Sequence, residues 1–434
     1  MTLSSSGPSA SAVLRSRTAR LGAYALGAVM LGAAQQAYAV LHLGAGVETD
    51  ALFAALAVPT FVLAVLNTAV ANVVVPILAG EEQERARRDS WTFLWWVTAA
   101  FVVLGLVLAV LAPVWMPYLA PGIDGADRDL AVDLSRIQMV AMVLNAQGTV
   151  VACCCQAGRR FRRPAVAMVV GGAFGLAASV VLLPTFGVHG AAWAEVVRLG
   201  VTFALIVVAL GRPVPPSWRS PALTSALSRM RPLVLGGLYY RSDVIVDRML
   251  ASLTPAGGLT LLALGTRLYG VGAQVVGSAV TVPALTDLAV DHKNDMPARF
   301  ERRWRRTLRT TVAITAAGWA LVCAGAIALA AMGGVGTFDT DDATRLAVVL
   351  VLLGGVLVGA AAGQVVSGAH YARGDTRTPT IIAVVAFTIG VILKVLGVLA
   401  FGLGGLAAAA SAYYLGSVVA SRRSLKHRET RARA

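Results

Sequence analysis

Charged residues and cysteines are scarce in this sequence, and it has no long polar segment. Asp, Glu, Lys and Arg make up 14% of the 434 residues, against about 25% in a typical soluble domain. No stretch between the apolar runs is long enough for a globular domain, which excludes a soluble enzyme carried on a membrane anchor. Three of the four cysteines are consecutive, so on a helix they point about 100° apart and cannot hold one metal ion. We therefore expect no metal site and no cofactor.

Apolar runs of about 20 residues recur along the whole chain, which predicts an all-α polytopic membrane protein. A transmembrane barrel is excluded, because its strands would alternate polar and apolar residues. We predict twelve membrane-spanning helices, over residues 21–42, 51–79, 91–119, 137–156, 165–184, 190–210, 232–252, 258–285, 310–333, 346–369, 380–401 and 404–420.

The net charge of +15 is distributed unevenly over the connections between these spans. With the N-terminus in the cytoplasm, 29 of the 37 Lys and Arg lie in inner segments and only Arg128, Arg136 and Arg345 in outer ones. This is the positive-inside pattern, so we expect both termini in the cytoplasm and no nucleic-acid binding. An alternative is a secretory signal, with basic residues before residue 21 and a cleavage site near 37–39. Cleavage there would leave eleven spans.

The two halves of the chain are copies of one another. Residues 164–194 align without a gap with residues 379–409, which brings Phe186-Gly187 onto Phe401-Gly402. A six-span unit is therefore repeated once, and because six is even, both copies enter the membrane in the same direction. Parallel repeats of this kind form two lobes around a central cavity, which favours a transporter that works by alternating access.

This organisation predicts the domain boundaries. We expect a cytoplasmic N-terminal tail over 1–20, an N-lobe over 21–210, a cytoplasmic linker over 211–231, a C-lobe over 232–420 and a basic cytoplasmic tail over 421–434.

Ionisable residues inside the spans point to the cavity, because each costs at least about 2.5–3.5 kcal/mol at mid-membrane. Arg267 has no charged residue within four positions and is the strongest candidate for an anion contact. Five basic residues against three acidic ones favour an anionic substrate. The in-span ionisable residues are Glu195, Arg198, Arg241, Asp243, Asp247, Arg248, Arg267 and Lys394, and Gln35 is a weaker polar candidate.

Each of these residues also has a purely structural interpretation. Glu195 and Arg198 are three apart on one helix face and can neutralise each other. Asp243 and Asp247 lie nearly opposite the two arginines of the same span, so at least one pair is expected to bind a neighbouring helix. Lys394 can extend towards the membrane surface or pair with an aspartate across the bundle.

The inner segment 296–309 predicts an amphipathic helix. Phe300, Trp304 and Leu308 form one apolar stripe with arginines around it. We expect this helix to lie on the anionic lipids of the inner leaflet, with a solvated charge run as the alternative.

Three segments resemble the lipid II flippase family (MurJ, also called MviN) of the multidrug/oligosaccharidyl-lipid/polysaccharide (MOP) exporter superfamily. They are LGAGVETDALFAALAVP (43–59), VDRMLASLTPAGGLTLLALGTRLYG (246–270) and GAHYARGDTRTP (368–379). The resemblance implies a V-shaped two-lobe transporter in the bacterial inner membrane, in which cavity arginines hold the pyrophosphate of an undecaprenyl-linked sugar. Arg267 matches one of these arginines, and Asp50 matches the family's aspartate.

The chain departs from the family at other cavity positions. Family arginines fall on Val29, Gln35 and Leu63, and a family glutamate falls on Thr68. The family usually has two more helices after the twelfth, which are not predicted here.

We therefore predict a non-enzymatic flippase or exporter, working as a monomer, that moves a lipid-linked glycan precursor or a similar anionic amphiphile outward. Arg267, Arg241, Arg248, Lys394 and Gln35 are the candidate substrate contacts. Asp50, Asp243, Asp247, Glu195 and Arg198 are the candidates for gating or for H⁺ or Na⁺ coupling. No G-x-x-x-x-G-K-[ST] loop is present, so ATP hydrolysis is not expected.

Two alternatives remain open at this point. One is a drug or metabolite exporter of the MATE type, which would bind lipophilic cations through Asp243 and Asp247. The other is a member that does not transport but organises cell-wall assembly through its basic inner loops.

Overall fold

The computed structural model describes residues 10–433 except 218–219, 278–287, 289, 292, 295, 374 and 376. The described residues are nearly all helical, and their β-structure is one isolated bridge between Val335 and Phe338. Long apolar helices give the chain this architecture, because a helix satisfies its own backbone hydrogen bonds within a bilayer. The elements are α1 (Ala10–Leu43), α2 (Val47–Ala55), α3 (Ala57–Leu78), α4 (Gln83–Val110), α5 (Ala112–Leu119), α6 (Gly125–Ala157), α7 (Arg162–Val207), η1 (Val208–Leu210), α8 (Pro221–Arg241), α9 (Asp243–Ser252), α10 (Gly258–Val276), α12 (Pro297–Ala331), α13 (Thr340–Ala372) and α14 (Arg377–Arg433).

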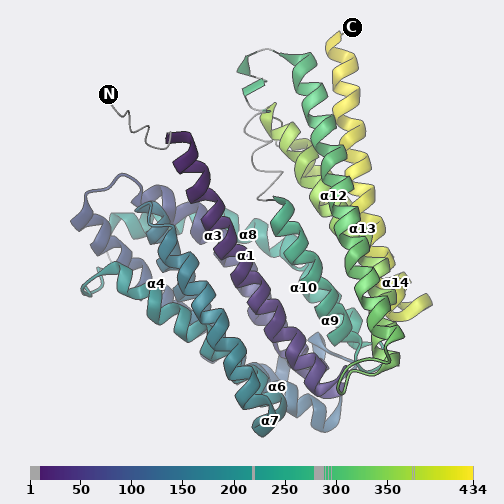
Figure 1. The fold of residues 1–434 in the computed structure, drawn as a ribbon. Coiled ribbons are helices and arrows are strands. Elements are labelled where there is room, and N and C mark those ends of the chain that lie inside the picture. The colour runs from purple at the N-terminus through teal and green to yellow at the C-terminus, as the bar shows by residue number, and fades with distance from the viewer. Residues whose placement is uncertain are drawn as a thin grey trace, which may run out of the picture. The chain divides into compact units, whose positions relative to one another are not determined.

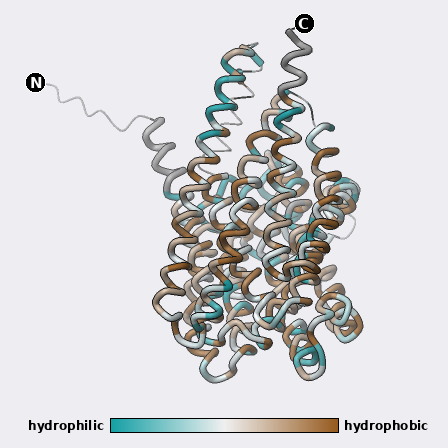
Figure 2. The backbone as a smooth tube through the Cα atoms, turned by 90° about the vertical axis from the view of Figure 1, so that its right-hand side faces the viewer, coloured by the Kyte–Doolittle hydropathy of each residue, from teal (hydrophilic) through white to brown (hydrophobic). Residues whose placement is uncertain are grey.

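The helices match the predicted all-α membrane fold. Nine helical segments among the described residues are long and apolar enough to cross a membrane. Two of them, Arg162–Leu210 and Arg377–Leu425, are 49 residues long and contain a break in helical geometry, so each holds two consecutive predicted spans. The predicted span 232–252 is present as the end of α8 followed by α9. Figure 2 shows hydrophobic residues along the middle of the helices and hydrophilic residues towards their ends.

The chain forms two compact units that interleave along the sequence. Unit 1 comprises Met1–Gln35, Val62–Ala109 and Ile137–Leu235. Unit 2 comprises Gln36–Phe61, Val110–Arg136 and Gly236–Ala434, so two segments of the first half pack with the second half. The boundaries of these compact units differ from the lobe boundaries that the repeat predicts. The predicted lobe boundaries therefore stay predictions.

The two helix breaks reproduce the internal repeat. Gly187 has φ 53° and ψ −133°, and Gly402, 215 positions later, has φ 57° and ψ −138°. Just after each break the helix doubles back closely: an added Cβ at Gly190 would lie 2.3 Å from the carbonyl oxygen of Leu182, and one at Gly405 would overlap the backbone of Gly397. The same residue types therefore make the same turn in both halves.

Gly402→Ala is expected to destabilise the protein by about 1–3 kcal/mol, because its φ and ψ lie in a region that essentially only glycine adopts. No atom lies within 4 Å of the added Cβ, so the cost is one of backbone conformation alone. Gly416→Ala is the matched control, since Gly416 is helical, its added Cβ also meets no atom within 4 Å, and alanine favours a helix by about 1 kcal/mol. Thermal unfolding in detergent measures both, and equal midpoints for the two variants would contradict the assignment.

Among the long helices of unit 2, α13 packs against both α12 and α14 (Figure 1). Their core includes Trp304, which is fully buried, with Phe300 and Leu308 on the same stripe of α12. Leu425 of α14 and Val365 of α13 close this cluster from the other side. The expectation that the stripe rests on lipid is therefore wrong: its apolar face has a protein partner, and 297–309 is the first part of the long helix α12.

Candidate functional site

Arg267 lies on α10, on a face that unit 2 leaves partly exposed. Gly265 and Gly272 face the other way and allow close packing on α13, where an added Cβ at Gly265 would lie 2.6 Å from Leu353. Arg267 is half-buried, and Gly270 and Gln274 on its own face are exposed. The spacing of three and seven residues places these side chains on one stripe. Arg267 is thus held by a rigid helix rather than by a loop.

Lys394 is buried at the centre of an ionic cluster in unit 2 whose two aspartates are half-buried. Its side chain is 1% exposed, and its Nζ lies 2.5 Å from Asp243 Oδ1 and 2.6 Å from Asp247 Oδ1. The Tyr413 hydroxyl donates a hydrogen bond of 3.0 Å to Asp243 Oδ2, and the ammonium lies 5.0 Å from the centre of the Tyr413 ring. Lys394 therefore pairs with aspartates across the bundle, and in this conformation it presents no open charge to a substrate.

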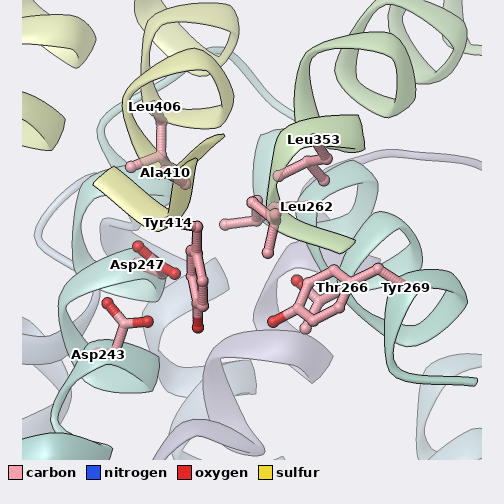
Figure 3. Close-up of a pocket in the computed structure, with 10 residues that line it drawn as sticks. Asp243, Asp247, Leu262, Thr266, Tyr269, Leu353, Leu406, Ala410 and Tyr414 are labelled. Carbon is pink, nitrogen blue, oxygen red and sulfur yellow. The ribbon is translucent and has the colours of Figure 1, made fainter. Parts of the chain in front are cut away.

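The two aspartates also line a small pocket. In Figure 3, Tyr414 lies between the two aspartates and three side chains of α10, which are Leu262, Thr266 and Tyr269. Val356, Leu353, Leu406 and Ala410 complete the lining. In the part of the chain that the structure describes, no three His, Cys, Asp or Glu side chains gather where they could hold a metal ion.

Asp50 is 7% exposed and binds the first turn of α10. Its Oδ2 accepts a hydrogen bond from the Gly257 amide at 2.8 Å, and its Oδ1 accepts from the amide and the hydroxyl of Thr260 at 2.8 and 2.7 Å. The first amides of a helix have no intrahelical partner, and Gly257 and Gly258 have no side chain that could cap them. A carboxylate at this positive helix end is stabilising, and here it comes from α2.

Gly257 makes this approach sterically possible. Its φ is +86°, and an added Cβ would lie 2.4 Å from the carbonyl oxygen of Ala45. The segment before α2 can therefore lie directly against the start of α10.

Two further side chains join the same segments. Arg248 of α9 donates a 3.0 Å hydrogen bond to the carbonyl oxygen of Phe53, and Asp342 of α13 accepts one of 3.2 Å from the Ala45 amide. We use the name α10 latch for the contacts of Asp50, Arg248 and Asp342 with these partners. The latch joins a segment of the first half, 44–53, to three helices of the second half.

Unit 1 contains a smaller polar group at positions related by the repeat. Arg198 and Glu195 form a two-pronged ion pair on α7, as their spacing predicts. Gln35 of α1 is 7% exposed, and an added Cβ at Gly175 would lie 2.7 Å from both its Oε1 and the Arg198 Cβ. In the second half, an added Cβ at Gly390 would lie 2.7 Å from the Tyr413 ring. Gly390 and Tyr413 lie 215 positions after Gly175 and Arg198.

Within unit 2 the candidate residues take part in different sets of contacts. Arg241 is exposed at the end of α8, while Arg248 and Asp50 belong to the α10 latch. The sequence analysis missed Thr260, Tyr413 and Tyr414. The repeat offers one signal for Tyr413, because it aligns this residue with the in-span Arg198.

The signature 368–379 has a structural role at the link between α13 and α14. His370 is buried, with its Nδ1 3.1 Å from Asp375 Oδ2 and its Nε2 3.2 Å from the Ser421 carbonyl oxygen. Asp375 also accepts a hydrogen bond from the Thr378 amide in the first turn of α14. These residues fix the turn between two helices, which explains why they occur as a compact motif.

Comparisons with known proteins match most of this chain. The family model described as lipid II flippase MurJ matches residues 40–432. The lipid II flippase MurJ of Burkholderia cenocepacia is 25% identical over 376 residues, covering 81% of this chain and 72% of that protein. A solved structure of lipid II flippase MurJ in an inward closed conformation has a TM-score of 0.81 at 17% identity, covering 94% of this chain and 87% of that one. An inward-facing MATE multidrug resistance transporter of the MOP superfamily has a TM-score of 0.76 at 16% identity, covering 92% and 94%.

Proposed function

The chain belongs to the lipid II flippase MurJ family, because the family model matches it over residues 40–432, and from this premise we propose that it moves a lipid-linked glycan precursor, lipid II in the first instance, from the inner to the outer leaflet. The match over nearly the whole chain carries this proposal. The family is one of transporters, so we propose transport and not catalysis as the activity. The two-lobe fold shared with MurJ and MATE structures supports alternating access as the mechanism.

Arg267 is the residue we propose to hold the anionic head of the substrate. A guanidinium presents a planar fork of donors that matches phosphate oxygens, and Arg267 lies on a partly exposed face of a rigid helix. Arg241 is exposed and is a second candidate. Lys394 and Arg248 are engaged by Asp243, Asp247 and the Phe53 carbonyl, which argues for structural roles instead.

Arg267→Ala is expected to reduce outer-leaflet lipid II at least tenfold, because one charge-assisted contact is worth about 1.5–3 kcal/mol. The assay uses cells that are depleted of their own flippase and express this protein. Arg267→Lys keeps the charge but loses the fork, so an intermediate level is expected.

Arg85→Ala is the control, since it removes an exposed arginine whose Nε lies 3.8 Å from Glu81. If wild-type protein is present in the membrane and no lipid II is exposed, lipid II is excluded as the substrate. If wild-type protein and Arg267→Ala expose it equally, Arg267 does not hold the head group.

A MATE-like exporter is the second candidate, because its structure covers 92% of this chain. That function would use Asp243 and Asp247 to bind a lipophilic cation. Lys394, at 2.5 and 2.6 Å, binds both carboxylates and offsets one of their two negative charges, which argues against a free cation in the place that the ammonium occupies. For the same reason we propose that this aspartate pair is not an open Na⁺ site.

The remaining expectations are part of the proposal. Both termini are placed in the cytoplasm on the distribution of Lys and Arg. The protein acts as a monomer with no nucleic-acid partner, and Asp50 gates the outer side through the α10 latch. Opening on that side would require the three hydrogen bonds of Asp50 to break.

A further inference from the structure

The first turns of α12 have a basic face opposite the buried stripe. Arg302, Arg306 and Arg309 are exposed and recur at spacings of four and three residues, which places them on one side of the helix. Phe300, Trp304 and Leu308 are on the other side and lie in the core. Burial of the apolar stripe therefore fixes the direction in which the three arginines point.

Acidic partners at this end of the helix are used by other arginines. Asp291 lies 3.4 Å from Arg299 and 3.2 Å from Arg303, and Glu301 pairs with Arg305. Within the described ranges, no ion pair joins an acidic side chain to Arg302, Arg306 or Arg309. The exposed face thus keeps a net charge of three over the eight residues 302–309, or about 10 Å of helix.

The same face of α12 becomes apolar where the membrane span begins. Ala313, Ala316 and Ala320 are exposed on the side of the three arginines. Thr311, Thr315 and Trp319 continue the buried stripe on the opposite side. Exposed aliphatic side chains on a membrane helix face lipid tails. The arginines lie on the same side of α12, just before the start of the predicted span at residue 310.

We propose that Arg302, Arg306 and Arg309 bind the phosphate groups of anionic lipids in the leaflet next to α12. The continuity of the charged face with the lipid-facing apolar face favours a lipid over a soluble anion or an acidic protein, because only a lipid fits both parts. The lipid is an annular partner of α12, distinct from the transported substrate. Basic residues near a membrane surface attract anionic lipid at about 1 kcal/mol each.

The test is a titration of short-chain dioctanoyl phosphatidylglycerol into the purified full-length protein in a non-ionic detergent. The triple variant Arg302→Gln/Arg306→Gln/Arg309→Gln is expected to bind it on the order of 100-fold more weakly, from the sum of three such contributions. The corresponding triple lysine variant is expected to stay within a few-fold of the wild type, because the charges are kept. Dioctanoyl phosphatidylcholine is expected not to compete.

Arg85→Gln/Arg87→Gln/Arg88→Gln is the matched control, since it also removes three arginines, all of them in ion pairs with Glu81 or Glu84. Equal weakening in the control and the α12 triple would overturn the proposal, as would wild-type affinity in the α12 triple. Competition by inorganic phosphate at the concentration of the lipid would also overturn it, by showing a site for free anions. Thermal unfolding of both triples without lipid, expected to match the wild type, verifies that the variants are folded.

Discussion

Asp50→Ala is expected to abolish outer-leaflet exposure of lipid II. The Asp50 carboxylate accepts three hydrogen bonds from the first turn of α10, two of them from backbone amides. Removing it leaves buried donors without a partner, at about 1–3 kcal/mol each. The α10 latch would then no longer hold the segment 44–53 against α10, and the outer side would not close during the cycle.

Two related variants separate the latch from general destabilisation. Asp50→Asn keeps one acceptor oxygen for Thr260 but turns an amide group towards the Gly257 amide, so we expect partial loss. Thr260→Val removes one hydroxyl donor and is expected to cost about 1 kcal/mol. Asp129→Ala is the control, because Asp129 is an exposed aspartate of α6. Asp50→Ala protein that is present at a normal level and exposes lipid II normally would show that the cycle does not need this latch.

Lys394→Met is expected to destabilise the protein by about 3–5 kcal/mol and to lose transport with it. Both aspartates lie within 2.6 Å of the ammonium, and removing one partner of a buried ionic group leaves uncompensated charge. Asp243 and Asp247 lie four residues apart on α9, so their mutual repulsion would no longer be offset by the ammonium that joins α9 to α14. Thermal unfolding in detergent measures the change, and Lys293→Met, at an exposed lysine, is the control.

Neutralising the whole cluster provides the decisive comparison. Asp243→Asn/Asp247→Asn/Lys394→Met removes all three charges, so it is expected to recover much of the lost stability. Each protein is measured with Na⁺ and again with choline in its place. We expect the wild type to be indifferent to this exchange, because Lys394 already supplies the positive charge. Stabilisation of the wild type by Na⁺ would show that the aspartates bind the ion, and an unchanged midpoint for Lys394→Met would show that the ammonium contributes no net stability.

Much of the fold was predictable because its signals are local in the sequence. Apolar runs predicted long membrane-spanning helices, and nine helical segments among the described residues are long and apolar enough to cross a membrane. The internal repeat predicted matching features 215 residues apart, and the breaks at Gly187 and Gly402 confirm it. The family resemblance, first seen in three short motifs, is confirmed over residues 40–432.

The site was only partly predictable, because helical spacing shows which residues share a face but not what that face meets. The stripe of Phe300, Trp304 and Leu308 was correctly assigned to one face, but lipid and protein are both apolar partners, and the sequence pattern does not distinguish them. In the tertiary structure this stripe packs against other residues of the protein.

The sequence by itself determined a membrane-spanning helical transporter with a duplicated unit and charged residues inside its spans, since burying apolar segments and satisfying their backbone hydrogen bonds depends on residues close together in the chain. Only the tertiary structure decided the partners of those charges. Lys394 meets Asp243 across 151 positions, and Asp50 meets Thr260 across 210. Such pairs form because a charge in a low-dielectric interior needs an opposite charge or donors at contact distance, and helix packing alone determines which residue is near enough to provide them.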